Sequence, residues 1–188
     1  MLGVSVTSAE RSRPSSGHVT RAAIALVLLL PVAAPAQDVT EPALKAAFIY
    51  NFAKFTEWPA DVVPVAEPFL LCVLGDAAVG DALERTVKGR MLGRHSLAVV
   101  MVTAADPHRM CHVLYVSGIT AAQATALVTA LQDLPVLTIG DVGGFVERGG
   151  IAHFFFERGQ LRFAVAVGSA RRARLLISSR LLALAKQP

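Results

Sequence analysis

The 188-residue chain has few of the residues on which a catalytic, metal-binding or nucleic-acid-binding function would depend. It contains two cysteines and one tryptophan; 6% of its residues are aromatic and 17% are charged. After the first 36 residues no block of five or six like charges occurs, which argues against a nucleic-acid-binding surface. The hydrophobic set makes up 54% of the chain, so we expect one well-cored globular domain rather than disorder.

The first 36 residues have the pattern of a cleaved signal peptide. Three arginines precede an apolar run over 22–30, and Ala34-Pro35-Ala36 is a small-residue site of the kind that signal peptidase accepts. The run is too short and too interrupted by proline for a spanning helix of about 20 apolar residues, so a retained membrane anchor is the weaker alternative. We therefore expect cleavage after Ala36 and export of residues 37–188 to the periplasm of a Gram-negative cell, as a protein that does not span the membrane.

The expected mature segment keeps both cysteines, Cys72 and Cys111. In an oxidising compartment an isolated, even pair of cysteines is most simply a disulfide. Cys72 lies in the first expected strand of the sheet and Cys111 just before the third. These two strands are neighbours when a doubly wound sheet has the order 2-1-3.

Strand and helix patterns alternate along residues 37–188. A helix is expected to begin at Glu41-Pro42 and to end at Trp58-Pro59, and a hairpin turn is expected at Arg158-Gly159. The other expected elements are strands at 69–74, 97–102, 112–116 and 136–139, helices at 79–87 and 121–131, the hairpin strands at 151–156 and 161–167, and a last helix at 170–185. This order predicts one α/β domain with a mainly parallel sheet flanked by helices, a C-terminal β-hairpin and a final helix.

The first expected helix is apolar over most of its circumference. Phe48, Phe52 and Phe55 recur in it at helical spacing, and polar positions are few. Such a helix must be covered by more than one neighbour, either its own sheet or a second subunit. The three phenylalanines are therefore assigned to the core or to a homodimer interface, and both alternatives stay open.

Two glycine-rich segments lie where a nucleotide would bind in an α/β protein. Residues 75–80 have the glycine spacing of a phosphate-binding loop, but Asp81-Ala82 stands where Lys-Ser/Thr is required. Residues 140–144 lack the third glycine of a dinucleotide fingerprint. Both segments are interpreted as turns. The alternative is a small-ligand-binding or enzymatic protein that uses the crevice beyond Gly75 and Gly140.

The densest group of potential metal ligands is formed by four residues, namely Asp106, His108, Cys111 and His112. Cys111 is the only partner for Cys72, and the expected strand alternation points His112 away from Cys111. Zinc sites normally need three or four converging ligands, which this set does not supply. No nucleophile with an adjacent base is recognisable either. We therefore expect a protein that is not an enzyme and that carries no metal and no cofactor.

Arginines of the expected last helix are the candidate contacts to a partner protein. Arg171 and Arg174 are three residues apart and can neighbour each other on one helix face, whereas Arg180 falls on the side opposite Arg171. Arginine is enriched at binding hot spots. Arg171 and Arg174 are therefore the expected partner-binding residues, with a merely solvated face as the alternative.

Several segments, in order along the chain, resemble the YfiR family. Residues 44–59, LKAAFIYNFAKFTEWP, are similar to the aromatic-rich opening helix of that family and its Trp-Pro ending; the other similar segments are 71–75, 111–117, 135–141, 145, 149–151 and 177–182. The resemblance implies a periplasmic Rossmann-like domain, often a dimer. It further implies repression of an inner-membrane diguanylate cyclase, by holding its periplasmic sensor domain, with less cyclic di-GMP and less biofilm as the result. Cys72 and Cys111 would then be the family's structural disulfide.

The chain departs from the family pattern at two positions. Ala166 stands where the last strand of the family commonly ends in asparagine, and Arg174 stands where glycine is common. Alanine cannot replace the hydrogen bonds of an asparagine side chain, so any contact that this side chain makes is lost here. The partner itself is not identified by the sequence and could be a sensor other than a cyclase.

Overall fold

The structure is a computed structural model, and it describes residues 39–62, 64, 67–106 and 108–186. The expected signal peptide, residues 1–36, lies outside the described residues. In the part of the chain that is described, no helix is long and apolar enough to cross a membrane.

A seven-stranded sheet forms the centre of the fold, with the strand order β3-β4-β2-β5-β6-β7-β8. Its strands are β2 (Phe69–Leu74), β3 (Met91–Leu92), β4 (His95–Val102), β5 (Val113–Val116), β6 (Leu137–Gly140), β7 (Ala152–Glu157) and β8 (Gln160–Val165). The five strands from β4 to β7 are parallel, and β3 and β8 pair antiparallel at the two ends. The predicted mainly parallel α/β sheet is confirmed, including the neighbouring positions of the first and third long strands.

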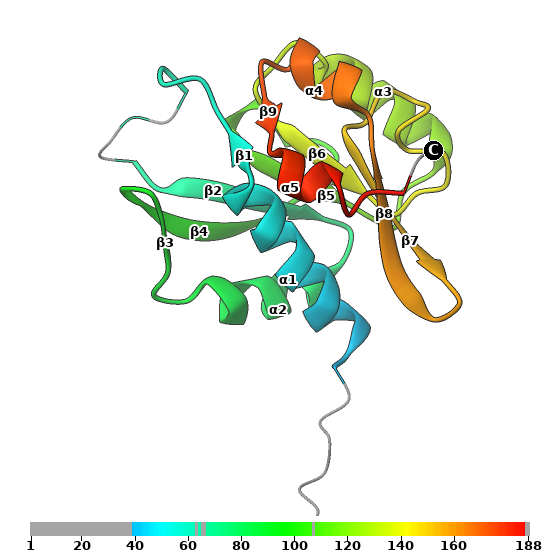
Figure 1. The fold of residues 1–188 in the computed structure, drawn as a ribbon, viewed down its shortest axis with the longest axis horizontal. Coiled ribbons are helices and arrows are strands. Elements are labelled where there is room, and N and C mark those ends of the chain that lie inside the picture. Colours follow the sequence, from blue (N-terminus) through cyan, green and yellow to red (C-terminus); the bar gives the residue numbers. More distant parts are fainter. Residues whose placement is uncertain (1–38, 63, 65–66, 107, 187–188) are drawn as a thin grey trace, which may run out of the picture. The chain divides into compact units, whose positions relative to one another are not determined.

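Helices cover both faces of this sheet (Figure 1). α1 (Glu41–Lys54) and α2 (Ala77–Val87) pack with one core cluster, whereas α3 (Ala121–Leu131) packs with a second cluster on the other face. Side-chain oxygens of the N-cap residues Thr40, Asp76 and Thr120 accept backbone N–H groups at the starts of the three helices. These caps define where each helix begins after a turn.

The aromatic side chains of α1 are covered within a single chain. Phe52 is fully buried, and Phe48 and Phe55 are partly buried against the same core cluster. The rings of Phe48 and Phe52 make edge contacts with Phe154 and Phe163 of the β7–β8 hairpin, at centroid distances of 5.1–5.9 Å. The apolar surface of α1, from which a homodimer interface was considered, therefore packs against the core of its own chain. Homodimerisation itself stays a prediction.

The β7–β8 hairpin turns at Arg158 and Gly159, as predicted. Both residues have positive φ angles, 52° and 75°, and Glu157 pairs directly with Gln160. Positive φ at both central positions is the geometry of a type I′ turn, whose twist matches that of the flanking strands.

The last segment differs from the single helix expected over 170–185. It forms α4 (Val167–Arg172), β9 (Leu176–Ile177) and the final helix α5 (Ser179–Leu182). Arg174 has a φ of 59°, which a right-handed helix cannot accommodate. Beyond it, β9 pairs antiparallel with β1 (Thr56–Glu57), so a long-range strand pair replaces the middle of the expected helix.

Candidate functional site

A disulfide links Cys72 of β2 with Cys111, which lies two residues before β5. The two Cα atoms are 5.8 Å apart, within the usual range for a disulfide. Because β2 and β5 are adjacent parallel strands, their pairing brings the two cysteines together across the sheet.

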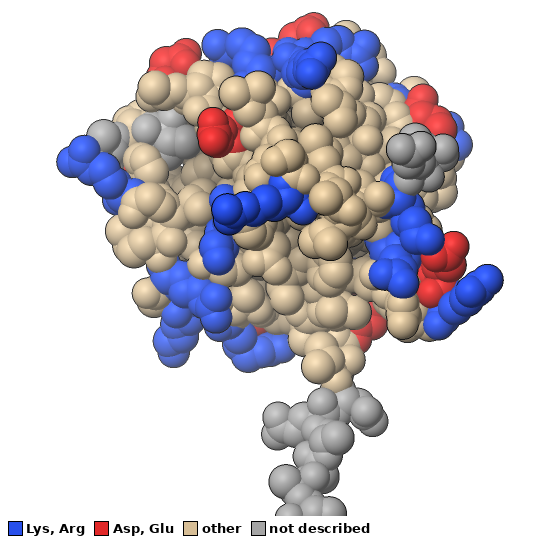
Figure 2. All heavy atoms as spheres, viewed as in Figure 1, with Lys and Arg blue, Asp and Glu red and all other residues tan. Residues whose placement is uncertain are grey.

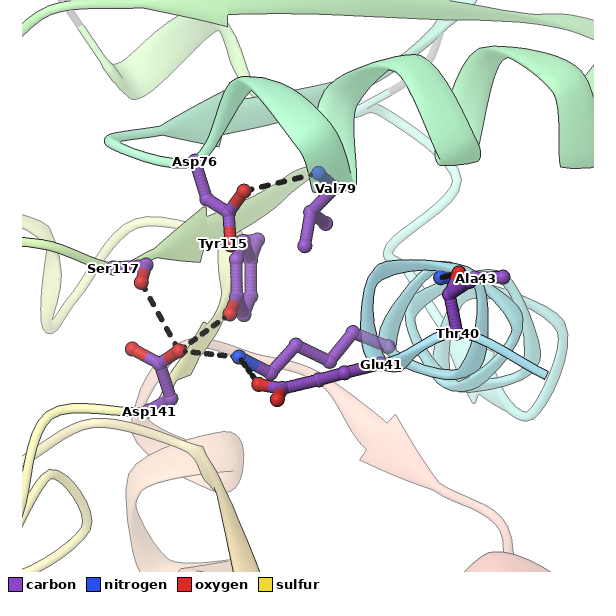
Figure 3. A network of polar contacts seen from close by, with 9 residues as sticks. Thr40, Glu41, Ala43, Asp76, Val79, Tyr115, Ser117 and Asp141 are labelled. Carbon is purple, nitrogen blue, oxygen red and sulfur yellow. Dashed lines mark hydrogen bonds and ion pairs between the residues drawn. The ribbon is translucent and has the colours of Figure 1, made fainter. Parts of the chain in front are cut away.

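The carboxyl ends of β5 and β6 carry a partly buried polar group that we call the Asp141 cluster, formed by Lys45, Tyr115, Ser117 and Asp141 (Figure 3). Asp141 Oδ2 accepts three hydrogen bonds: from Lys45 Nζ at 2.8 Å, from the Tyr115 hydroxyl at 2.7 Å and from the Ser117 hydroxyl at 3.0 Å. Lys45 also forms an ion pair with Glu41, one turn earlier on α1, at 2.7 Å. The cluster thus attaches the start of α1 to the ends of two central strands.

The electrostatics of the Asp141 cluster oppose a general-base role for its lysine and tyrosine. Burial alone would lower the pKa of Lys45, but its hydrogen bonds to Asp141 and Glu41 raise that pKa above the ordinary value. Burial, followed by the negative charge of Asp141, raises the pKa of the Tyr115 hydroxyl. A lysine and a tyrosine that hold their protons more firmly than usual are poorer general bases, so this arrangement favours a structural role.

This cluster was not predicted from the sequence. Lys45 and Asp141 are 96 residues apart, so no local pattern joins them. Two signals were present: a lysine within an otherwise apolar helix, and an aspartate directly after a buried strand. A lysine in such a position needs a carboxylate partner if it is buried.

A hollow of about 430 Å³ lies beside the Asp141 cluster. Residues of the cluster, of the loop after β6 and of β7 line it: Glu41, Lys45, Asp141, Gly143, His153 and 154–156. Partial burial lowers the pKa of His153, an effect that the nearby charges of Glu147 and Asp141 oppose. The hollow contains ionisable side chains, but those of Lys45 and Asp141 are already paired with each other.

The strand-end glycines that would open a nucleotide crevice are instead packed against protein. A Cβ atom on Gly75 would overlap the backbone carbonyl of Ser117, and the φ of Gly75 is 87°. A Cβ atom on Gly140 would lie 2.7 Å from the ring of Phe145. Close approach of the chain to itself explains both glycines.

The candidate metal ligands at 106–112 are each engaged separately. Asp106 accepts hydrogen bonds from the backbone N–H and hydroxyl of Thr103, which lower the pKa of its carboxyl group. His108 Nε2 lies 2.9 Å from the Thr103 carbonyl oxygen, and His112 Nδ1 accepts the backbone N–H of Leu70 at 2.8 Å. Among the residues that the structure describes, no three His, Cys, Asp or Glu side chains are grouped to hold a metal ion.

Arg171 and Arg174 are both exposed. The expectation that they share one helix face is wrong, because α4 ends at Arg172. Arg171 lies near the end of α4, whereas Arg174 follows that helix in the left-handed conformation. Arg174 makes an ion pair with Asp61 at 3.7 Å, and Leu176, 62% exposed, lies two residues further on. Figure 2 shows lysine and arginine side chains gathered on the upper rim of this face, above α4. Val167, Arg171, Arg174 and Leu176 are all exposed and lie close together in the sequence, and we call these four residues the C-terminal patch.

Comparison with known proteins matches residues 42–186 to the model of the YfiR/HmsC-like family. The chain belongs to this family. Its members are known as periplasmic regulators rather than catalysts. The match covers every helix and strand described above except the first residue of α1.

A crystal structure of a conserved domain protein from Vibrio cholerae is similar in fold, with a TM-score of 0.53 and 15% sequence identity. The similarity covers 79% of this chain and 60% of that one, so this chain spans less than two thirds of that protein. At this identity the likeness concerns the fold alone. No curated protein matches the sequence.

Proposed function

We propose that residues 37–188 form a periplasmic regulatory binding protein, which represses an inner-membrane diguanylate cyclase or a similar sensor by binding its periplasmic domain. The observation that carries this proposal is the match of residues 42–186 to the YfiR/HmsC-like family. The catalytic output would belong to the partner, and the role of this chain would be to occupy a surface of that partner.

The chemistry of the described residues supports binding rather than catalysis. The side chains of the Asp141 cluster are paired with one another, and the pKa shifts of Lys45 and Tyr115 are opposite to those of a lysine or tyrosine base at neutral pH. The Cys72–Cys111 disulfide supports an oxidising location such as the periplasm.

The C-terminal patch is the proposed contact surface for the partner. Binding hot spots combine arginine with apolar side chains that become buried. In this patch Arg171 and Arg174 lie close in sequence to Val167 and Leu176, two apolar residues that are already exposed in the free chain. An interface here would bury that apolar area without rearrangement of the core.

The proposal is tested with the mature protein and the periplasmic domain of a membrane cyclase encoded beside it. The wild-type domain is expected to be retained by the immobilised protein, and the double variant Arg171→Glu, Arg174→Glu is expected to bind more weakly. The double variant Arg85→Glu, Arg109→Glu is the matched control, because it changes the net charge equally and both arginines are exposed and lie outside the patch. Equal weakening by the control would assign the effect to net charge rather than to the patch.

Repression by binding also predicts how the effect in cells depends on the amount of the protein. Deletion of the gene is expected to raise cyclic di-GMP and biofilm, and overexpression is expected to deepen repression, because a binder acts only while it occupies its target. If deletion leaves cyclic di-GMP unchanged and no neighbouring sensor domain is retained by the protein, the proposal fails.

A further inference from the structure

The end of α2 and the turn that follows it carry a concentration of positive charge. Residues 85–94, RTVKGRMLGR, contain four lysines or arginines and no aspartate or glutamate, and the next carboxylate along the chain is that of Asp106. Figure 2 shows lysine and arginine side chains gathered at the lower left, over this part of the fold. With Lys54, at the end of α1, the four form what we call the basic surface, in which all five side chains are exposed: Lys54, Arg85, Lys88, Arg90 and Arg94.

Two cations of the basic surface lie beside one aromatic ring. Arg90 Cζ is 5.0 Å from the centroid of the Tyr50 ring, and Lys54 Nζ is 5.5 Å from it. A cation near an aromatic face is attracted by the quadrupole of the ring. The packing of α1 against the end of α2 therefore brings positive charges from two separate segments to one place, although like charges repel. An external anion would offset this repulsion.

The basic surface is not neutralised by ion pairs within the described part of the chain. The ion pairs there are made by other basic residues, namely Lys45, Arg162, Arg174 and Lys186. Glu57 and Glu84 are the nearest carboxylates in the sequence, and both are exposed without an ion pair to the basic surface. Five cations outnumber these two carboxylates, so the surface keeps a positive charge.

An exposed apolar side chain accompanies these charges. Met91 directly follows Arg90 and is 55% exposed, whereas the next residue, Leu92, packs against the core. Met91 and Leu92 form the two-residue strand β3, which turns into β4 through Gly93 and Arg94. Met91 therefore lies on a short hairpin with an arginine on either side in the sequence. Apolar side chains among lysines and arginines are the combination by which peripheral proteins bind anionic membrane surfaces.

We propose that the basic surface binds the face of a bilayer that contains anionic phospholipids. The phosphate head groups supply negative charge for the five cations, and Met91 reaches the boundary between head groups and acyl chains. A bilayer fits this surface better than an acidic protein, because it requires no complementary shape and accepts a charged and an apolar contact together. The proposal does not depend on the proposed regulatory function, and the basic surface shares no residue with the C-terminal patch.

The first test is cosedimentation of the mature protein with two kinds of vesicle. Vesicles that contain phosphatidylglycerol are expected to bind it, and vesicles of phosphatidylcholine alone are not. Added salt is expected to release the protein, because salt screens interactions between exposed charges. Absence of binding to the phosphatidylglycerol vesicles at low salt would overturn the proposal, as would equal binding to both kinds of vesicle.

Two double variants assign the binding to the basic surface. Lys88→Gln with Arg90→Gln is expected to weaken vesicle binding about 25-fold, since each lysine or arginine near an anionic membrane strengthens binding about fivefold. Arg109→Gln with Arg180→Gln is the matched control, because it removes the same charge from exposed residues outside the basic surface and the C-terminal patch. The control is expected to bind nearly as well as wild type. An equal loss in both double variants would show that net charge alone governs binding, and the proposal would fail.

A fluorescent label at position 91 separates a bilayer from other anions without any change in the basic residues. The two native cysteines are bonded to each other, so Met91→Cys supplies a single free thiol for an environment-sensitive label. Its emission is expected to shift to shorter wavelength with phosphatidylglycerol vesicles, and to stay unchanged with inorganic phosphate or polyglutamate. A shift with polyglutamate but not with vesicles would identify an acidic protein as the partner, and a shift with phosphate alone would identify a small anion. Either result would overturn the proposal.

Discussion

Replacement of Arg174 by glycine is expected to stabilise the fold even if it weakens partner binding. Arg174 has a φ of 59°, a left-handed conformation that costs a residue with a Cβ atom about 1–2 kcal/mol. Glycine adopts it without that cost but loses about 0.4–1 kcal/mol through the greater freedom of the unfolded chain. The ion pair with Asp61 would also be lost. At 3.7 Å between side chains that are 55% and 73% exposed, it contributes only about 0.3 kcal/mol. The net gain in the free energy of unfolding is about 0.5 kcal/mol.

Arg171 provides the control for this prediction because it is the same residue type in a different backbone conformation. It lies within α4, where glycine in place of arginine costs about 0.5–1 kcal/mol. The two Arg-to-Gly variants are therefore expected to differ by about 1 kcal/mol, with Tm values about 3 °C apart for a domain of this size. Urea and thermal unfolding of both variants measure the difference.

A destabilised Arg174→Gly variant, with a loss equal to that of Arg171→Gly, would refute the reasoning. It would show that backbone strain at position 174 does not govern stability there. Should Arg174→Gly bind the sensor domain less well while unfolding at a higher temperature, the binding loss could not be attributed to misfolding.

Three further predictions follow from the structure. Ala166 is the N-cap residue of α4 and makes no side-chain cap, so Ala166→Asn is expected to add about 1 kcal/mol to the free energy of unfolding; no gain in urea denaturation would contradict it. Replacement of both Cys72 and Cys111 by serine is expected to remove about 4 kcal/mol, from the 39-residue separation that the disulfide spans, and non-reducing mass spectrometry of the periplasmic protein should show the two linked rather than free. Burial lowers the pKa of His112, so between this lowered pKa and the ordinary value of about 6.5 the unfolded chain binds more protons than the folded one; stability is therefore expected to decrease as pH falls through this range, by up to about 1.4 kcal/mol per unit. A His112→Gln variant should flatten this dependence, and an unchanged slope would exclude His112 as its source.

The parallel sheet could be predicted from the sequence because its signals are local. Each central strand is a short apolar run that ends near glycine or aspartate, and each connecting helix has a capping residue directly before it, as with Asp76 and Thr120. The hairpin turn was likewise marked by its own residues, Arg158-Gly159. These elements depend on sequence neighbours, so a pattern over ten residues contains most of the information.

The parts that could not be predicted depend on residues far apart in the chain. The helical pattern over 170–185 gave no sign that Leu176 and Ile177 pair with residues 56–57, because a two-residue strand has too few positions to show alternation. The Asp141 cluster joins residues from α1, β5 and the loop after β6, and its members look like ordinary helix and turn residues when taken singly. The position of Lys54 and Arg90 beside the same Tyr50 ring becomes visible only once α1 and the turn after α2 are placed together.

The β1–β9 pair has a consequence for how the chain reaches its final form. It joins Thr56 with Ile177. A strand close to the start of the described chain is therefore completed by a strand close to its end. A polypeptide emerges from the ribosome N-terminus first, and the partners of α1 and β1 in the hairpin and β9 are among the last residues to appear. The aromatic face of α1 therefore cannot be covered by the β7–β8 hairpin until the hairpin residues are available for folding. A chain truncated before Leu176 would keep β1 without its partner strand.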